Sequence, residues 1–283
     1  MKTARAKTIA LAGVLSILVG SSGCADGRLD VRPVQTSHGD NSESDLKIAD
    51  SALSGENTDL AGTLYERVLT AHPDSIRARL GLADVAYQSG DLNRAQVLYS
   101  QAASQAPNQP GAQLGLARVA LRQRRLDDAA MLYRALLAAQ PDNVLAAEGL
   151  GTVLDLQQHH EQAQAVYRRA LQAHPDAQGI RIDLGLSLVL SNRAREGVNT
   201  LLDVAGLSDA PWQARQNLAF GYGVLGKPDS ARKVLQFDLP PSAVDDNLRV
   251  YQTVRAKLAV RTPSAVPPPR AANEEGPTST RKQ

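Results

Sequence analysis

The stretch GLADVAYQSGDLNRAQVLYSQAASQAP, residues 81–107, has the pattern on which most of the chain is built. Its alanines, its second tyrosine and its final proline recur with a constant step of 34 residues. The sets that share this step are Pro73, Pro107, Pro141 and Pro175; Tyr65, Tyr99, Tyr133 and Tyr167; Ala61, Ala95, Ala129 and Ala163; and the small residues Ala49, Ala83, Ala117, Gly151, Gly185 and Ala219. Because a fixed period of this length marks a repeat architecture, the sequence predicts one small unit stacked several times.

Each unit contains two amphipathic segments of about a dozen residues, joined by a short turn such as residues 88–91. Alanine and glycine recur where two helices must cross closely, and proline ends the second helix because it restricts the residue before it. In period and pattern the chain resembles the tetratricopeptide repeat family. One helix pair cannot bury its apolar face alone, so the units must stack. The predicted fold class is all-α, a tetratricopeptide-repeat superhelix of about six repeats with a C-terminal capping helix.

The 34-residue register defines the repeat boundaries. The six predicted repeats are residues 42–75, 76–109, 110–143, 144–177, 178–211 and 212–245. The last two depart from the pattern, since Gly197 replaces the second-helix alanine, Leu201 and Leu235 replace the tyrosine, and Asp209 replaces the proline.

A separate helix is expected after the pair Pro240-Pro241. We expect it to run from Ser242 to about Leu258, with Ser242 as the N-cap and Asp245 at the third helical position in an approximate capping box. Such a helix would cover the apolar face of the last repeat.

The N-terminus has basic, then uncharged, then small residues, which is the order found in an export signal. Lys2, Arg5 and Lys7 precede twelve uncharged residues, 9–20, and small residues follow at 21–23. Twelve residues rise only ~18 Å as a helix, which is too short to span a hydrocarbon core of ~30 Å.

The only cysteine, Cys24, directly follows those small residues. Here the sequence resembles a bacterial lipoprotein, which implies that Cys24 is lipidated and becomes the first residue of the mature protein. Ser21 stands where the family usually has leucine, and the alternative is ordinary cleavage nearby, for example after Ala25, with Cys24 discarded. Since residue 25 is not the aspartate that retains such lipoproteins at the inner membrane, the resemblance implies a lipid-anchored protein on the periplasmic face of the outer membrane.

These features divide the chain into four parts. We expect a signal peptide at 1–23, a flexible tether at 24–41, the repeat superhelix with its capping helix at 42–259, and a disordered proline-rich tail at 260–283. Removal of the signal leaves 28 basic against 29 acidic residues, so nothing in the charge balance indicates a nucleic-acid partner.

No catalytic, cofactor-binding or metal-binding motif is evident in the sequence. The pair His159-His160 falls at the turn inside the fourth repeat, where adjacent side chains diverge, so we interpret it as a solvated turn. With Cys24 acylated, no thiol remains for catalysis. We therefore predict that the chain is not an enzyme and needs no cofactor or metal, the alternative being an enzyme whose site has no recognisable motif.

The family resemblance implies that a partner protein binds in the groove lined by the first helix of each repeat, mainly at repeat positions 2, 5, 9, 12 and 13. The predicted groove residues are Leu46, Asp50, Leu53, Leu80, Asp84, Tyr87, Leu114, Arg118, Leu121, Ile182, Leu186, Val189 and Phe220. Glu148 and Asp155 make the middle of this surface acidic, whereas both ends are apolar. We expect an amphipathic helix or extended segment as the ligand. The alternative is that some of these leucines pack between adjacent repeats.

The last third of the chain resembles one particular group within the tetratricopeptide repeat proteins. Residues 182–205 and 214–258 resemble the tetratricopeptide repeat lipoprotein of tight-adherence (Tad/Flp) pilus systems, the TadD family. The features that carry this resemblance are Asn217, Leu218 and Ala219; Asp238 and Leu239; and Asn247, Leu248 and Tyr251. The resemblance implies a pilotin or adaptor that binds the secretin or another Tad component. The alternative is a scaffold lipoprotein of another envelope machine, such as polysaccharide export or outer-membrane protein insertion.

Overall fold

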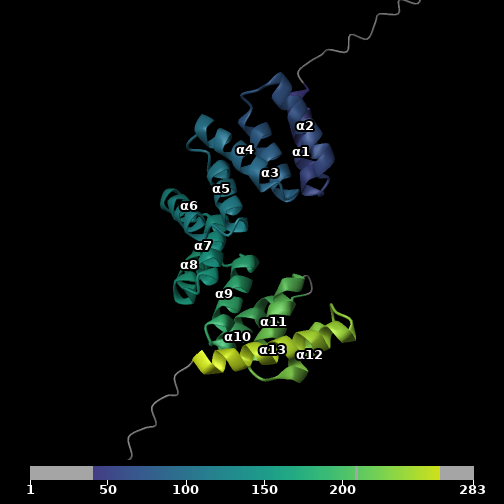
Figure 1. Cartoon of the computed structure of the whole chain (residues 1–283), viewed down its shortest axis with the longest axis vertical. Coiled ribbons are helices and arrows are strands. Elements are labelled where there is room, and N and C mark those ends of the chain that lie inside the picture. Colours follow the sequence, from purple (N-terminus) through teal and green to yellow (C-terminus); the bar gives the residue numbers. More distant parts are fainter. Residues whose placement is uncertain (1–40, 208–209, 262–283) are drawn as a thin grey trace, which may run out of the picture. The chain divides into compact units, whose positions relative to one another are not determined.

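The computed structural model describes residues 41–207 and 210–261, and these residues form α-helices joined by short turns, with no strand in those ranges (Figure 1). The first helices of the repeats are α1 (Ser42–Ser54), α3 (Ile76–Gln88), α5 (Pro110–Arg122), α7 (Val144–Leu156), α9 (Gln178–Leu190) and α11 (Trp212–Val224). The second helices are α2 (Thr58–Ala71), α4 (Leu92–Gln105), α6 (Leu126–Ala139), α8 (His160–Ala173), α10 (Ala194–Ala205) and α12 (Pro228–Leu235). Helix α13 (Pro241–Arg261) follows. The predicted all-α repeat fold is confirmed.

Local sequence explains where the helices begin and end. Ser75 caps α3 by accepting a hydrogen bond from the backbone N–H of Ala78 at 3.3 Å, and Asn143 caps α7 by accepting one from Ala146 at 2.9 Å. The second helices α2, α4, α6 and α8 all end two residues before a proline, and the residue in between is non-helical, with φ between −129° and −136°. The repeated proline therefore ends each second helix by restricting its neighbour.

The turn inside each repeat depends on one left-handed residue. Six residues with positive φ recur with the 34-residue step, at Glu56, Gly90, Arg124, Gln158, Asn192 and Gly226. Glycine reaches this conformation without strain, whereas the four other residues adopt it at a conformational cost. The same reversal of the chain direction thus recurs in all six helix pairs.

A tyrosine ring joins each of the first three repeats to the next. The rings of Tyr65, Tyr99 and Tyr133 are fully buried, and they lie directly on the backbone of Gly81, Gly115 and Gly149 respectively. A Cβ at any of these glycines would overlap the ring. The glycine therefore lets the first helix of one repeat approach the second helix of the repeat before it.

The contact changes at the fourth repeat. Asp183 occupies the place of Gly81, Gly115 and Gly149 in the 34-residue register. The ring of Tyr167 instead lies on Gly151, a position that holds Ala83 and Ala117 in earlier repeats. In the fifth repeat a Cβ at Gly197 would overlap the backbone of α9, so α9 and α10 cross more closely than an alanine would allow.

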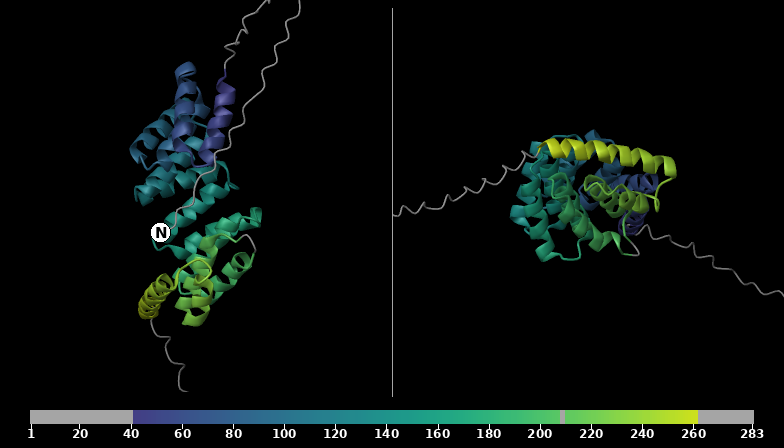
Figure 2. Two further views of the ribbon diagram at one scale, coloured as in Figure 1. Left: turned by 90° about the vertical axis from the view of Figure 1, so that its right-hand side faces the viewer. Right: turned by 90° about the horizontal axis from the view of Figure 1, so that it is seen from below.

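Helix α13 begins earlier and ends later than predicted. Pro241 is its first residue, and the backbone N–H of Val244 donates to the carbonyl of Pro240 at 3.1 Å. Proline favours the first helical position because it has no N–H to satisfy there. The prediction that Ser242 is the N-cap is therefore wrong, since Ser242 lies inside the first turn. Helix α13 packs along α11 and α12 (Figures 1 and 2).

Several predicted segments lie outside the described residues. These are Cys24, the signal peptide 1–23, nearly all of the tether 24–41, and the tail beyond residue 261. None of the helices in the described ranges combines the length and the apolarity needed to cross a membrane.

The tyrosine–glycine contact yields a stability prediction. We expect Gly149→Ala to lower the free energy of unfolding by about 1–3 kcal/mol, because the new methyl group would overlap the buried ring of Tyr133. Gly111→Ala is the matched control, since its Cβ would lie 3.5 Å from Leu80, an ordinary contact. The control should be neutral or gain up to about 1 kcal/mol of helix propensity. Urea unfolding measures both, and equal effects of the two variants would contradict the packing argument.

Candidate functional site

The first helices of neighbouring repeats touch one another along the whole repeat array. Helix α1 contacts α3, α3 contacts α5, α5 contacts α7, α7 contacts α9, and α9 contacts α11. We call the side of these helices that holds the predicted groove residues the inner face. It is the one surface to which all six repeats contribute first-helix side chains, so a ligand lying on it could contact several repeats at once.

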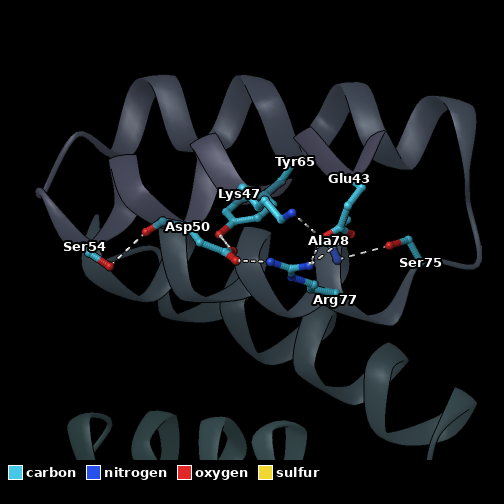
Figure 3. A network of polar contacts seen from close by, with 8 residues as sticks. All are labelled: Glu43, Lys47, Asp50, Ser54, Tyr65, Ser75, Arg77 and Ala78. Carbon is cyan, nitrogen blue, oxygen red and sulfur yellow. Dashed lines mark hydrogen bonds and ion pairs between the residues drawn. The ribbon is translucent and has the colours of Figure 1, made fainter. Parts of the chain in front are cut away.

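The N-terminal end of the inner face is held by a polar network around Asp50 (Figure 3). Tyr65 donates its hydroxyl to Asp50 at 2.6 Å, and Arg77 donates to the other carboxylate oxygen, also at 2.6 Å. Arg77 also bonds Glu43 at 3.2 Å, and Lys47 lies 3.8 Å from that carboxylate. Burial raises the pKa of Asp50, but these hydrogen bonds outweigh it and hold the pKa below its usual value. Asp50 therefore joins two repeats and is already paired.

The second and third repeats carry an aromatic–arginine cluster on the same face. Tyr99 donates its hydroxyl to Asp84 at 2.6 Å, and Arg118 lies 3.7 Å from that carboxylate. The guanidinium carbons of Arg118 and Arg122 lie 4.3 and 4.8 Å from the ring centre of Tyr87. Burial keeps the pKa of Asp84 above its usual value despite these partners. The predicted groove residues Asp84, Tyr87 and Arg118 are thus brought together.

The fourth and fifth repeats place three carboxylates on the inner face. Asp155 accepts hydrogen bonds from Ser187 at 2.6 Å and Tyr167 at 3.2 Å. Burial, followed by the charges of Glu148 and Asp155, raises the pKa of Asp183 to about 7. Burial also raises the pKa of Glu148. Within the described part of the chain, no cation forms an ion pair with Glu148 or Asp183.

A buried polar network joins the fourth and fifth repeats. Gln164 is almost fully buried and donates to Ser191 at 2.9 Å, while its carbonyl accepts a hydrogen bond from Arg193 at 2.9 Å. Ser187, also fully buried, lies beside Gln164 at 3.5 Å. Valine stands at the place of Ser187 in the three preceding repeats, and this substitution was the sequence signal for the network.

Helix α13 occupies the inner face of the last two repeats. The ring of Tyr251 packs edge-on against Phe220, with ring centres 5.4 Å apart and planes at 64°. Leu258 forms a buried cluster with Val189, and Val254 packs against it. The predicted groove residue Phe220 therefore contacts the chain's own C-terminal helix, and Val189 belongs to the same buried cluster as Leu258 of that helix.

The predicted groove residues divide into three groups. Leu46, Ile182 and Val189 are buried in the core, as the packing interpretation allowed, so they are not accessible to a ligand. Half-buried side chains on the face are Leu53, Leu80, Leu114, Leu121, Leu186 and Phe220. Asp50, Asp84, Tyr87 and Arg118 are partly exposed but engaged within the chain. Whether these residues bind a partner stays a prediction.

Two exposed leucines on the fourth repeat were not among the predicted groove residues. Leu145 is 59 % exposed and Leu156 is 41 % exposed. They stand at repeat positions 2 and 13, which the family pattern assigns to the groove, so the sequence contained the signal. Position 2 does adjoin the inner face of the preceding repeat, because Arg77 at that position bonds Asp50 of the first repeat.

An apolar cavity of about 780 Å³ lies where the end of α13 meets the fourth and fifth repeats. Its lining residues are Asp155, Leu156, Gln158, His160, Leu190, Val254, Ala256, Lys257, Leu258 and Val260. The lining therefore combines residues of α7, α8, α9 and the turn after α7 with residues of α13.

The residues that the structure describes contain no cluster of three potential metal ligands. His160 lies 2.7 Å from Asp155 through its Nδ1 atom, whereas His159 is exposed, so the two adjacent rings diverge. The interpretation of the pair as a solvated turn is right for His159 and wrong for His160, which begins α8 and is largely buried against Asp155.

The tetratricopeptide repeat family model matches residues 46–110, 80–144 and 114–178. Residues 46–178 of the chain thus carry tetratricopeptide repeats. Repeat proteins of this kind generally use their extended curved surface to bind other proteins. No curated protein sequence matches the chain.

Solved tetratricopeptide repeat structures share its fold. A repeat protein from Parabacteroides merdae is 15% identical with a TM-score of 0.60, over 78% of this chain and 88% of that chain. The pilF protein of Pseudomonas aeruginosa is 16% identical with a TM-score of 0.61, over 76% and 97%. A chain of the APC/C hetero-tetramer Cut9–Hcn1 is 17% identical with a TM-score of 0.66, and the match covers 74% of this chain and 42% of that chain. At these identities the likeness concerns the fold alone.

The raised pKa of Asp183 predicts a stability that depends on pH. The folded state keeps the proton up to about pH 7, whereas the ordinary value is 3.8, so stability falls as pH rises between these values. Asp183→Asn removes this loss. Its stability relative to the parent chain should rise by about 2–3 kcal/mol between pH 5 and pH 8.

Urea unfolding at the two pH values measures this difference. Asp176→Asn is the control, because Asp176 is exposed and should give the same small effect at both pH values. A pH-independent effect of Asp183→Asn would show that the carboxyl is already ionised at pH 5.

Proposed function

We propose that this tetratricopeptide repeat protein is a lipid-anchored adaptor of the bacterial envelope that holds a segment of a partner protein on its inner face. The observation that carries the proposal is that one part of the inner face is covered by α13 and another part is exposed. Helix α13 covers the inner face at Phe220, whereas Leu145 and Leu156 on α7 stay exposed. Exposed apolar side chains beside a groove are typical anchors for an amphipathic helix or an extended segment.

The machine we propose is the Tad/Flp pilus assembly system, with the secretin or another Tad component as the partner. The sequence resemblance of residues 182–205 and 214–258 to the TadD family supports this step. The fold likeness to Pseudomonas aeruginosa pilF adds no support, because it is a likeness of fold at 16% identity. In this role the chain acts as a pilotin that helps the secretin reach or assemble in the outer membrane.

The anchor that we propose is lipid on Cys24, supported by the position of this only cysteine directly after the export signal. One acyl chain binds a membrane only marginally, so stable anchoring needs two or more. Attachment to the membrane and to the partner together raises the effective concentration of the partner at the membrane without any new contact. The lipid and the groove would therefore act together to hold the partner at the membrane.

The groove is tested by removing its exposed anchors. We expect Leu145→Ser with Leu156→Ser to reduce capture of the partner more than tenfold, because each buried leucine side chain contributes roughly 1.5–3 kcal/mol. Capture is measured by crosslinking in intact cells, purification from membranes and identification of the crosslinked proteins. The matched control is Val97→Ser with Met131→Ser, which changes equally exposed residues on the second helices α4 and α6.

The captured protein decides between the machines. A secretin or another Tad component supports the proposal, whereas a component of polysaccharide export or outer-membrane protein insertion would assign the chain to that machine. Equal capture by both double variants would show that the exposed leucines of the inner face do not bind the partner.

The anchor is tested by Cys24→Ala. We expect this variant to lose secretin multimers from the outer membrane, because the chain would no longer carry its bound partner there. Fractionation and blotting of the secretin measure the multimers, at matched amounts of the variant and the parent chain. Unchanged yield and location of the multimers would rule out the lipid-dependent part of the proposal.

A further inference from the structure

The apolar cavity at the end of α13 continues an interface that the chain already uses. Along α13, Val254 and Leu258 pack on the inner face beside Val189. The same two side chains line the cavity together with Leu156 and Leu190. An open apolar groove thus lies beside the last turns of α13.

The inner face beside this groove is acidic. Asp155 lines the cavity itself. Glu148 precedes Asp155 by about two turns of α7 and lies next to α9, because its carboxylate is 3.7 Å from where a Cβ of Gly179 would lie, and Asp183 follows Gly179 by one turn of α9. Half-buried aspartates elsewhere on the inner face have arginine partners from the next repeat, as Asp50 has in Arg77. The fifth repeat has Gly179 at the position of Arg77, so it supplies no such cation.

One residue of the cavity lining is a lysine or arginine, and it comes from α13. Lys257 belongs to α13, and its neighbours from that helix in the lining are the apolar side chains of Val254, Leu258 and Val260. His160 also lines the cavity, but its Nδ1 atom is already 2.7 Å from Asp155. A ligand in the cavity would therefore meet apolar side chains from α7, α9 and α13 and the carboxylate of Asp155. A ligand that continues along α7 and α9 would also meet Glu148 and Asp183.

We propose that this groove binds an amphipathic helix of the partner protein, with apolar anchors in the cavity and lysine or arginine residues facing Glu148, Asp155 and Asp183. The proposal deepens the proposed function, on which it rests, by naming the chemistry of the partner segment. Two observations select this occupant. The groove lies beside a helix that the chain already packs there, and the carboxylates of Glu148 and Asp183 next to it, which form no ion pair among the described residues, complement a basic ligand.

Two other occupants fit less well. The chain's own residues 262–283 follow α13, but Val266 is their only large apolar residue and five prolines occur among residues 261–283. Such a segment offers neither paired apolar anchors nor a helix. A second copy of the chain would have to bring a basic apolar helix, and α13 itself is already packed on α11 and α12.

The test compares two synthetic peptides. One is a 14-residue amphipathic helix built only of leucine and lysine, and its twin has glutamate in place of every lysine. Fluorescence anisotropy of each labelled peptide with the full chain gives the two affinities. We expect the lysine peptide to bind at least tenfold more tightly than the glutamate peptide, and this comparison needs no variant that could fail to fold.

Variants then locate the site. At pH 8, where Asp183 is ionised, Glu148→Gln with Asp183→Asn should weaken the lysine peptide about tenfold and should not weaken the glutamate peptide. The matched control, Asp59→Asn with Glu161→Gln, removes the same charge from exposed residues on α2 and α8 and should change neither affinity. Circular dichroism checks that each variant stays helical. Equal affinities of the two peptides, or equal weakening by both double variants, would overturn the proposal.

A photo-crosslinking amino acid in place of Leu156 identifies the occupant in cells. A crosslink to residues 262–283 or to a second copy of the chain would overturn the proposal. Capture of a partner from this position, together with equal binding of the two peptides, would keep the proposed function and overturn the charge chemistry. Absence of any protein crosslink here and from Leu145 would contradict both.

Discussion

The stacking of this chain depends on the contact between a tyrosine ring and a helix backbone that carries no side chain at that point. Tyr65 on Gly81, Tyr99 on Gly115 and Tyr133 on Gly149 each join the second helix of one repeat to the first helix of the next. Since a repeat array is stabilised by the interfaces between neighbours, these contacts determine how the first helices align. The hydroxyl groups of Tyr65 and Tyr99 also bond aspartates of the inner face. Core packing and the functional surface are therefore coupled through the same side chains.

The acidic part of the inner face arises where that contact is interrupted. Asp183 takes the place of the glycine, and Tyr167 moves onto Gly151, which has lost the methyl group of the earlier alanines. The exchange keeps the ring buried but leaves a carboxyl group close to Glu148 and Asp155. Burying such a group is costly, and the raised pKa of Asp183 reflects that cost. Natural proteins break packing rules of this kind mainly at functional sites, which is why the interruption marks the groove.

The sequence was sufficient for the repeat architecture and insufficient for the surface. A 34-residue step predicts helices, turns and repeat boundaries because it depends on local features such as the proline that ends each second helix. It does not separate a leucine that packs inward, such as Leu46, from one that stays partly accessible, such as Leu80, because both stand at repeat position 5. Burial there depends on the size of the neighbours in the adjacent repeat. The signal for Asp183 was present, as a break in a row of glycines, but its meaning required the ring of Tyr167.

Helix α13 could be predicted to exist, but its position could not. Its apolar residues indicated a cover for the last repeat, whereas in the structure they also reach the inner face of the fifth repeat through Leu258 and Val189. This placement shows that the inner face accepts a helix with aromatic and aliphatic anchors. Because α13 is covalently attached, it competes for its own site at a high effective concentration, and a free partner helix would rarely displace it. The surface left for a partner is therefore the groove beside the last turns of α13, with Asp155, Leu156 and Leu190 in its lining.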